Sequence, residues 1–139
     1  MLVRVVIAVA IIAAAAIAGL LFTKRSGRVR LSDGRFDRRQ LASVGLDPNG
    51  ADALALLLGS PTCAPCTVVK RVLEEVSTAR PGLKWVYADA GDHLDLARAH
   101  RVMRVPTLFV LDLDGRILAR TSGIPATRDL ERVLDRPAA

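Results

Sequence analysis

The sequence is poor in aromatic residues, cysteine and histidine. Its 139 residues include one Trp, one Tyr, three Phe, two Cys and two His. Proteins that bind nucleic acids stack bases on aromatic side chains, so this scarcity argues against a nucleic-acid partner. A structural zinc site needs four ligands, and beyond the two cysteines the chain offers only His93 and His100, which share another predicted segment. No internal repeat is present, so repeat architectures are excluded as well.

One stretch near the N-terminus lacks charge altogether. Val5 to Phe22 reads VVIAVAIIAAAAIAGLLF, 18 residues without a charged or strongly polar side chain. This length is about the minimum for a helix that crosses the hydrocarbon core, and a buried core helix would show a polar face. We therefore predict a single-pass transmembrane anchor over residues 1–22. A cleaved signal peptide is the alternative, because Ala16-Ile17-Ala18 fits the small-x-small cleavage pattern.

Basic charge is abundant only beside this apolar run. The net charge is +6, but from residue 31 onward 15 basic side chains face 14 acidic ones, a net charge of +1. The excess comes from five residues near the apolar run: Arg4, Lys24, Arg25, Arg28 and Arg30. Such a cluster attracts anionic headgroups. By the positive-inside rule it favours an anchor in the cell membrane with the domain on the cytoplasmic side. An extracytoplasmic domain stays open, because signal anchors with a short positive N-terminus also insert the other way round.

The remaining chain alternates between strand and helix patterns. A basic juxtamembrane linker with a short helix over 36–44 fills residues 23–45, and turn chemistry at Asp47–Gly50 opens a domain over 46–139. Ala51–Gly59 is an apolar run that fits a buried strand, although its Ala and Leu content also allows a helix. The other expected strands are 83–89, 107–112 and 116–123, and the expected helices are 64–80, 93–101 and 126–135, the last one capped by Thr127. This order predicts an α/β fold: a central mixed four-stranded sheet, βαβ followed by ββα, with helices on both faces.

The two cysteines lie three positions apart, in CAPC at the start of a predicted helix. Cys63 faces the free N–H groups and the positive end of the helix dipole, which favours a thiolate nucleophile. Cys66, one turn into the helix and more buried, is then the resolving thiol, and Pro65 fits the first turn. A zinc or copper clamp is a competing interpretation, and a static structural disulfide is another.

Pro106 lies forty residues after Cys66, in RVPTLFV, at the entrance of the third strand. A central strand disfavours proline. The position is intelligible if the preceding bond is cis and the loop lies against the dithiol. A trans proline at the strand edge explains the residue equally well.

Together these residues resemble the thioredoxin family. The resemblance covers about Ala51 to Asp135 and rests on CAPC at a strand-helix junction, VPT at Pro106, a hairpin, Gly123 and a final helix. It implies a thiol-disulfide oxidoreductase in which Cys63 attacks a substrate disulfide and Cys66 resolves the mixed disulfide. It also implies a substrate held as an added strand by the Val105 backbone. The implied substrate-binding residues are Thr62, Ala64, Pro65, Val105 and Pro106.

The chain departs from the family's pattern at four positions. Thr62 replaces the tryptophan that precedes the first cysteine, and Arg71 replaces the helix-kinking proline. Leu57 replaces a buried acidic residue thought to assist proton transfer from the resolving thiol. The strand lysine that neighbours this acid is replaced by an apolar or aromatic residue near Trp85. Losing both members of the pair avoids an unpaired buried charge but leaves Cys66 without an obvious proton acceptor.

The resulting expectation is a membrane-anchored protein-disulfide reductase that takes part in cell redox homeostasis. Ala64-Pro65 is close to the Gly-Pro dipeptide of reductive thioredoxins. No cofactor is implied beyond the Cys63/Cys66 dithiol. The expected partners are protein disulfide substrates, the lipid bilayer, and a reducing partner that is thioredoxin reductase-like or a membrane electron donor. The alternatives are an extracytoplasmic thiol-disulfide exchanger for cytochrome or disulfide maturation, and a non-enzymatic CxxC metal-binding module.

Overall fold

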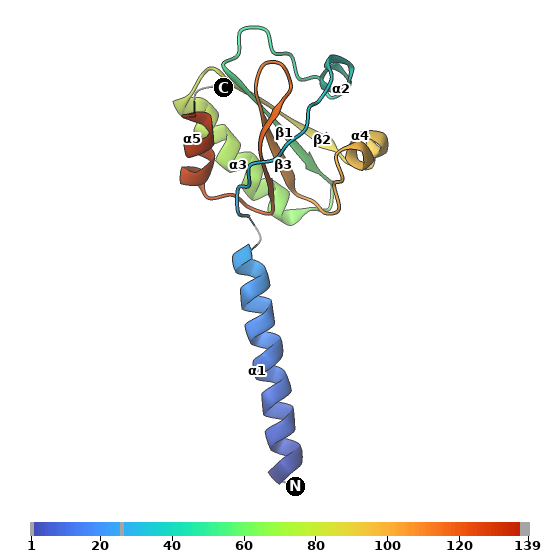
Figure 1. Cartoon of the computed structure of the whole chain (residues 1–139), viewed down its shortest axis with the longest axis vertical. Coiled ribbons are helices and arrows are strands. Elements are labelled where there is room, and N and C mark those ends of the chain that lie inside the picture. The colour runs from blue at the N-terminus through green and yellow to red at the C-terminus, as the bar shows by residue number, and fades with distance from the viewer. Residues whose placement is uncertain (1, 26, 137–139) are drawn as a thin grey trace.

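The computed structural model describes residues 2–25 and 27–136 of the chain. Figure 1 shows one long helix, α1 (Leu2–Arg25), that projects away from an α/β unit. The elements of this unit are α2 (Arg38–Ser43), β1 (Ala53–Gly59), α3 (Ala64–Ala79), β2 (Leu83–Asp89), α4 (Leu94–Ala99), β3 (Thr107–Leu111), β4 (Ile117–Ser122) and α5 (Thr127–Leu134). The predicted strands and helices of the unit are all present, with ends within two residues of those expected.

Helix α1 is long and apolar enough to cross a bilayer. Its apolar part, Val3–Leu21, spans 19 residues, none of which is buried against the rest of the chain. The helix continues to Arg25, three residues beyond the expected end of the anchor at residue 22. The first two basic residues after the apolar run therefore belong to the helix rather than to the linker.

The sheet has the strand order β2-β1-β3-β4, with β1 parallel to β2 and the other neighbours antiparallel. The β1 segment, ambiguous in the sequence, is an inner strand of the sheet, and both of its faces are covered. Leu54, Leu56 and Leu58 point into one hydrophobic cluster, whereas Ala55 and Leu57 point into the other. A period of two with apolar residues on both faces is what a fully buried strand requires.

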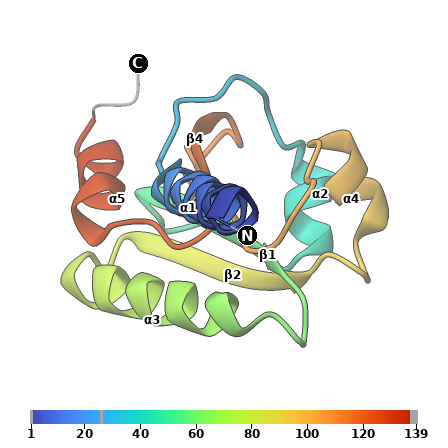
Figure 2. The ribbon, with the colours of Figure 1, turned by 90° about the horizontal axis from the view of Figure 1, so that it is seen from below.

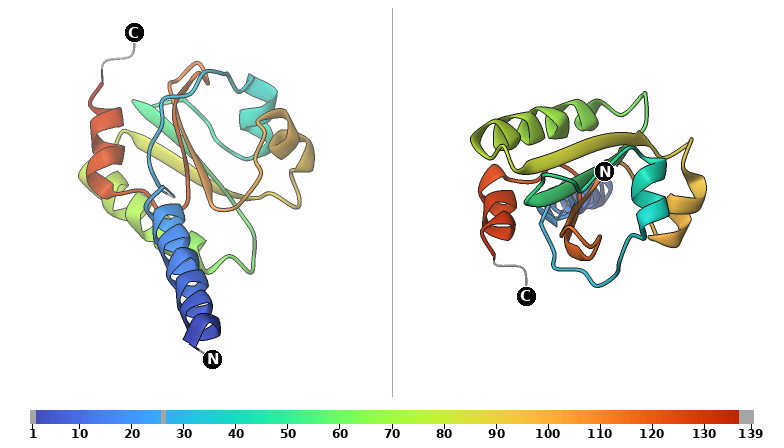
Figure 3. Two further views of the ribbon diagram at one scale, coloured as in Figure 1. Left: turned by 60° about the horizontal axis from the view of Figure 1, so that its bottom comes forward. Right: turned by 90° about the horizontal axis from the view of Figure 1, so that it is seen from above.

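Helices cover both faces of the sheet, as predicted. Figures 2 and 3 show α3 with α5 on one side and α2 with α4 on the other. The first pair contributes Val69, Leu73, Val76, Leu130 and Val133 to its cluster. The second pair contributes Leu41 and Leu96 to the other cluster, which also contains Val44 at the C-cap of α2. The α3 face is the one that carries the cysteines.

Residues 27–36, expected to be part of a linker, run along the outer edge of β4. Gly27 N–H donates to the Ser122 carbonyl at 2.7 Å, and Arg30 exchanges two backbone hydrogen bonds with Arg120 at 2.8 and 2.7 Å. Phe36 N–H donates to the Gly115 carbonyl at 2.8 Å, and its ring is 1% exposed. This segment therefore belongs to the folded unit, because its backbone forms hydrogen bonds with the free edge of β4 and the Phe36 ring is part of the core.

The prediction that Thr127 caps the last helix is wrong. Thr127 is the first helical residue of α5, and Ala126 precedes it in the extended conformation of an N-cap, with φ −73° and ψ 133°. Ala126 has no side-chain acceptor, so α5 begins without a side-chain capping bond.

His100 lies on the α2 and α4 face, in a cluster with two phenylalanines and Arg120. Its ring stacks on Phe36 with centroids 3.6 Å apart and meets the edge of Phe109 at 5.9 Å. The Arg120 guanidinium donates to the His100 carbonyl at 2.8 Å. Burial, followed by the Arg120 charge, lowers the pKa of His100 below its ordinary value of 6.5, while Asp37 acts in the opposite direction.

This pKa shift makes the stability of the domain depend on pH. The unfolded chain takes up a proton on His100 near pH 6.5, whereas the folded chain takes it up only at lower pH. The resulting stabilisation is present above pH 6.5 and is lost as the pH falls towards the folded pKa. We expect a lower urea midpoint at about pH 5.5 than at about pH 7.5, with a smaller difference in His100→Phe. His93→Asn is the matched control, and an undiminished pH dependence in His100→Phe would contradict the assignment.

Candidate functional site

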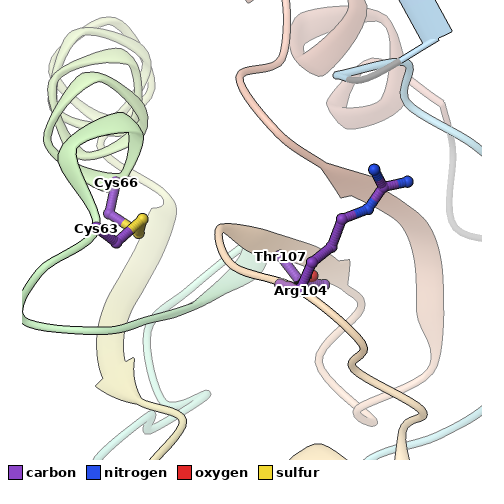
Figure 4. Close-up of a disulfide and its surroundings, with 4 residues drawn as sticks. All are labelled: Cys63, Cys66, Arg104 and Thr107. Atoms are coloured by element: carbon purple, nitrogen blue, oxygen red, sulfur yellow. Dashed lines mark hydrogen bonds between the residues drawn. A yellow bond between two sulfur atoms is a disulfide. The ribbon is translucent and has the colours of Figure 1, made fainter. Parts of the chain in front are cut away.

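The two cysteines form a disulfide where β1 leads into α3. Their Cα atoms are 5.3 Å apart, and no free cysteine remains among the described residues. Strand β1 ends at Gly59, residues 60–62 form the connecting turn, and Cys63 is the N-cap of α3. Figure 4 shows the disulfide at the start of this helix.

The first turn of α3 holds Cys63 at the positive end of the helix. Cys63 has extended dihedral angles, φ −83° and ψ 93°, and makes no side-chain capping bond. Pro65 is in the first turn, where its missing N–H leaves no hydrogen bond unmade. The unpaired N–H groups and the helix dipole stabilise negative charge at this position. Once the disulfide is reduced, this environment favours the thiolate of Cys63.

The two sulfur-bearing side chains differ in exposure. Cys63 is half-buried, whereas Cys66 is 3% exposed. The predicted difference in burial is therefore confirmed. Three of the predicted substrate-binding residues, Thr62, Ala64 and Pro65, are exposed around Cys63.

The Pro106 loop lies at the same end of the sheet as the dithiol. In the antiparallel register Thr107 of β3 faces Leu58 of β1, two residues before the turn that leads to Cys63 begins. The Val105-Pro106 bond is cis, which decides the alternative left open by the sequence. The loop is held by a hydrogen bond from the Thr107 hydroxyl to the Arg104 carbonyl at 2.7 Å, and Figure 4 shows it across from the disulfide.

Histidines do not complete a ligand set with the two cysteines. His100 packs on the α2 and α4 face of the sheet, whereas Cys66 is a buried residue of α3, which covers the other face. Among residues 2–25 and 27–136, no three His, Cys, Asp or Glu side chains gather closely enough to hold a metal ion.

Comparison with known proteins agrees with this geometry. No family model matches the chain. A thioredoxin of Bacillus subtilis (strain 168) is 31% identical over 78 residues, which cover 55% of this chain and 74% of the relative. The chain belongs to the thioredoxin family.

Solved thioredoxins share the fold of this family member. Mitochondrial thioredoxin 3 of Saccharomyces cerevisiae, in its oxidised form, has a TM-score of 0.53 at 23% identity, covering 63% of this chain and 80% of that chain. Chloroplastic thioredoxin z has a TM-score of 0.56 at 20% identity, covering 76% of this chain and 93% of that chain. Membership of the thioredoxin family and the CxxC pair identify a thiol-disulfide oxidoreductase in general terms.

At the position of the thioredoxin family's buried acid, this domain has a buried apolar residue, as the sequence indicates. Leu57, at the position of the family's buried acid, is 0% exposed and pairs with Tyr87 of β2. Trp85, near which the sequence placed the substitute for the family's lysine, pairs with Ala55 instead. The residue opposite Leu57 is therefore Tyr87, which the sequence analysis did not select. Its position follows from counting the parallel register from Ala53 and Leu83.

Tyr87 does not replace the missing acid as a base. Burial, together with the charges of Asp89 and Asp92, raises the pKa of its phenol above 10.0, so the group is neutral at physiological pH. The Lys70 ammonium lies 3.7 Å from the centre of the Tyr87 ring. Lys70 follows Cys66 by one helical turn, so this cation–π pair lies on the Cys66 side of α3.

Gly59 allows Cys66 and Tyr87 to approach the end of β1. A Cβ at this position would lie 2.5 Å from Cε2 of Tyr87 and 2.9 Å from Sγ of Cys66. Both distances are shorter than real Cβ contacts, so a side chain here would displace the ring and the sulfur. The sequence marked Gly59 only as the end of a strand, because this crowding depends on contacts between elements.

Gly59→Ala is expected to destabilise the oxidised domain by about 1–3 kcal/mol, as overpacked cores do. Urea unfolding measures the change. The double variant with Tyr87→Ala should lose less than the sum of the two single variants, because removing the ring removes one clash. Additive losses would show that contact with the ring is not the cause.

Proposed function

We propose that this protein is a membrane-anchored thioredoxin-like reductase that transfers two electrons from Cys63 and Cys66 to protein disulfides. The observation that carries the proposal is the placement of the dithiol. Cys63 lies half-buried at the positive end of α3, and Cys66 is buried one turn further on. The Pro106 loop lies at the same end of the sheet.

In the proposed reaction the reduced protein attacks with the Cys63 thiolate. Its sulfur forms a bond to one substrate sulfur, and the other substrate sulfur leaves as a thiolate. Val105 and Pro106 hold the substrate chain beside the dithiol, with Thr62, Ala64 and Pro65 in contact with it. The electron pair of the old disulfide bond goes to the leaving sulfur, which then takes up a proton from water.

The second step releases the substrate. The Cys66 thiol gives its proton to water, and the resulting thiolate attacks Sγ of Cys63 and displaces the second substrate sulfur as a thiolate. The substrate gains two electrons, and this protein is left with the disulfide seen in the structure. A reducing partner with its own dithiol, either thioredoxin reductase-like or a membrane electron donor, restores the active form, and no other cofactor takes part.

Membrane anchoring is the second part of the proposal. The exposed apolar helix α1 supports an anchor in the cell membrane, and the basic residues after its apolar part support a cytoplasmic domain. In this proposal the anchor over residues 1–22 continues as α1 to Arg25, residues 27–45 pack on the domain instead of forming a free linker, and residues 46–139 carry the redox chemistry.

An extracytoplasmic thiol-disulfide exchanger is the second candidate. Thr62 and Leu57 keep it open, because they depart from the residues that the thioredoxin resemblance implies at these positions and so point to more specialised chemistry. The same two cysteines would then act with the opposite topology and a membrane electron donor.

The test is the reduction potential of the Cys63–Cys66 couple, measured on the full chain in detergent micelles against defined thiol buffers. A value near about −270 mV supports the reductase and the cytoplasmic orientation. A value between about −180 and −120 mV rejects the reductase in favour of an oxidant or isomerase outside the membrane.

A further inference from the structure

The connection between α1 and the domain is short and fixed at its far end. Only residue 26 separates Arg25, the last residue of α1, from Gly27. Gly27 is buried, donates its N–H to the Ser122 carbonyl at 2.7 Å, and has φ +84°. A Cβ on Gly27 would overlap the carbonyl oxygen of Ile124, so only glycine fits this contact. The chain is therefore attached to the domain within two residues of the end of α1.

This attachment point lies at the dithiol end of the sheet. Ser122, which holds Gly27, pairs with Thr107, and Gly123 N–H donates to the Pro106 carbonyl at 2.9 Å. Thr107 pairs in turn with Leu58 at the end of β1. Adjacent strands are about 4.8 Å apart, so Leu58 of β1 is about 10 Å from Ser122 of β4. Figure 1 shows α1 meeting the domain at the end of the sheet from which α3 begins.

Simple chain geometry places this end of the domain against the lipid headgroups. The apolar part of α1 ends at Leu21, and the helix rises about 6 Å from there to Arg25. That rise is about the thickness of one headgroup layer. The two steps from Arg25 to Gly27 add at most about 7 Å. Three strand spacings from Gly27 to Leu58 and the five residues from Leu58 to Cys63 complete the path, so the dithiol is held within at most about 40 Å of the headgroup surface when α1 spans the bilayer.

Apolar side chains are concentrated at the same end. Outside α1, six large apolar side chains are exposed among the described residues. Four of them flank the dithiol end: Val68 in α3, Leu94 at the start of α4, Met103 before the Pro106 loop, and Ile124 after β4. Met103 is 89% exposed, the highest value in this group. An apolar rim around a redox centre provides contact area for a protein that approaches between the domain and the bilayer.

We propose, on the basis of the function above, that the substrates are disulfides of membrane proteins located close to the lipid surface. The short tether prevents the dithiol from reaching disulfides far from the bilayer. It also confines the dithiol and a membrane-bound substrate to one thin layer, which raises their effective concentration. The electrons follow the two exchange steps given above, from this dithiol to the substrate disulfide.

The experiment uses the full chain in phosphatidylcholine vesicles and a synthetic peptide that contains one disulfide. The peptide is presented either free in solution or joined to a lipid headgroup through a short spacer. The comparison variant carries a helical Glu-Ala-Ala-Ala-Lys insertion of about 20 residues after residue 26, which lifts the domain by about 30 Å. A Gly-Ser insertion of the same length is the flexible control, and single-turnover reduction of the peptide is the readout.

We expect the native chain to reduce the lipid-linked peptide at least about tenfold faster than the helical insertion variant does. The Gly-Ser variant should be intermediate, and all three chains should reduce the free peptide at equal rates. Equal rates on the lipid-linked peptide, or a faster helical variant, would overturn the proposal while leaving the reductase intact. If the native chain fails to reduce either peptide, the proposed function itself is wrong.

Discussion

Replacing Cys63 by Ser is expected to abolish disulfide reduction. Serine keeps the size of the side chain but has no thiolate to attack a disulfide, and the remaining thiol, Cys66, is only 3% exposed and does not reach a substrate disulfide. We expect a loss of at least about a thousandfold, to the level of the uncatalysed exchange. Reduction of a protein disulfide in the presence of a thiol buffer measures the effect.

Cys66→Ser should behave differently, because Cys63 keeps its place at the helix end. The first exchange still occurs, but nothing resolves the bond between Cys63 and the substrate. The variant should therefore accumulate mixed disulfides, visible on a non-reducing gel as a species that dithiothreitol removes.

Thr67→Ser is the matched control for both variants, since Thr67 is exposed on the same helix next to Cys66. It should retain the native rate and accumulate no mixed disulfide. Turnover at the native rate in Cys66→Ser would show that the two-cysteine mechanism is wrong.

Leu57→Asp is expected to unfold most of the domain at neutral pH. Leu57 is 0% exposed at the centre of the sheet, between Tyr87 and Leu108, with the buried face of α3 above it. Truncation of such a side chain costs about 2–5 kcal/mol, and an isolated buried carboxylate adds several more. Whole domains are stable by about 5–15 kcal/mol, so circular dichroism and urea unfolding should show the loss.

The pH dependence of this variant separates charge from polarity. Burial would raise the folded-state pKa of the introduced carboxyl, so the folded form binds a proton more readily than the unfolded form. Leu57→Asp should therefore be less destabilised at about pH 4.5 than at about pH 7.5, after subtraction of the same difference in Leu57→Asn. A stable Leu57→Asp protein with faster turnover would contradict this reasoning and would mean that the charge finds a partner.

The strand and helix pattern of the domain was predictable because each element has a clear local signal. Residues 83–89 are identical in the predicted and observed strands, and Gly115 at φ +80° ends the predicted hairpin turn. The β1 segment was ambiguous because a strand buried on both faces has no alternation of apolar and polar residues. Thr127 was misplaced because a cap depends on the exact residue at which the helix begins.

The dithiol itself was visible in the sequence, but its surroundings were not. Cys63 and Cys66 are three positions apart in sequence, so their geometry follows from one helix turn. Tyr87 and Gly59 matter because β2 pairs with β1 and brings the Tyr87 ring to the same glycine that Cys66 approaches. Residues 27–36 looked like a linker because they are polar and charged, and their pairing with β4 uses the backbone alone. Backbone pairing over such a separation leaves no side-chain pattern to detect.

The pairing of residues 27–36 with β4 can form only late in the synthesis of the chain. Gly27 emerges directly after α1, but its partner Ser122 follows 95 positions later. At about 5–20 residues per second, roughly 5–20 s pass before this partner strand exists. During this interval the nascent domain can turn freely about its attachment to α1. The backbone contact that holds Gly27 forms only when β4 leaves the ribosome, after the cysteines have already been made.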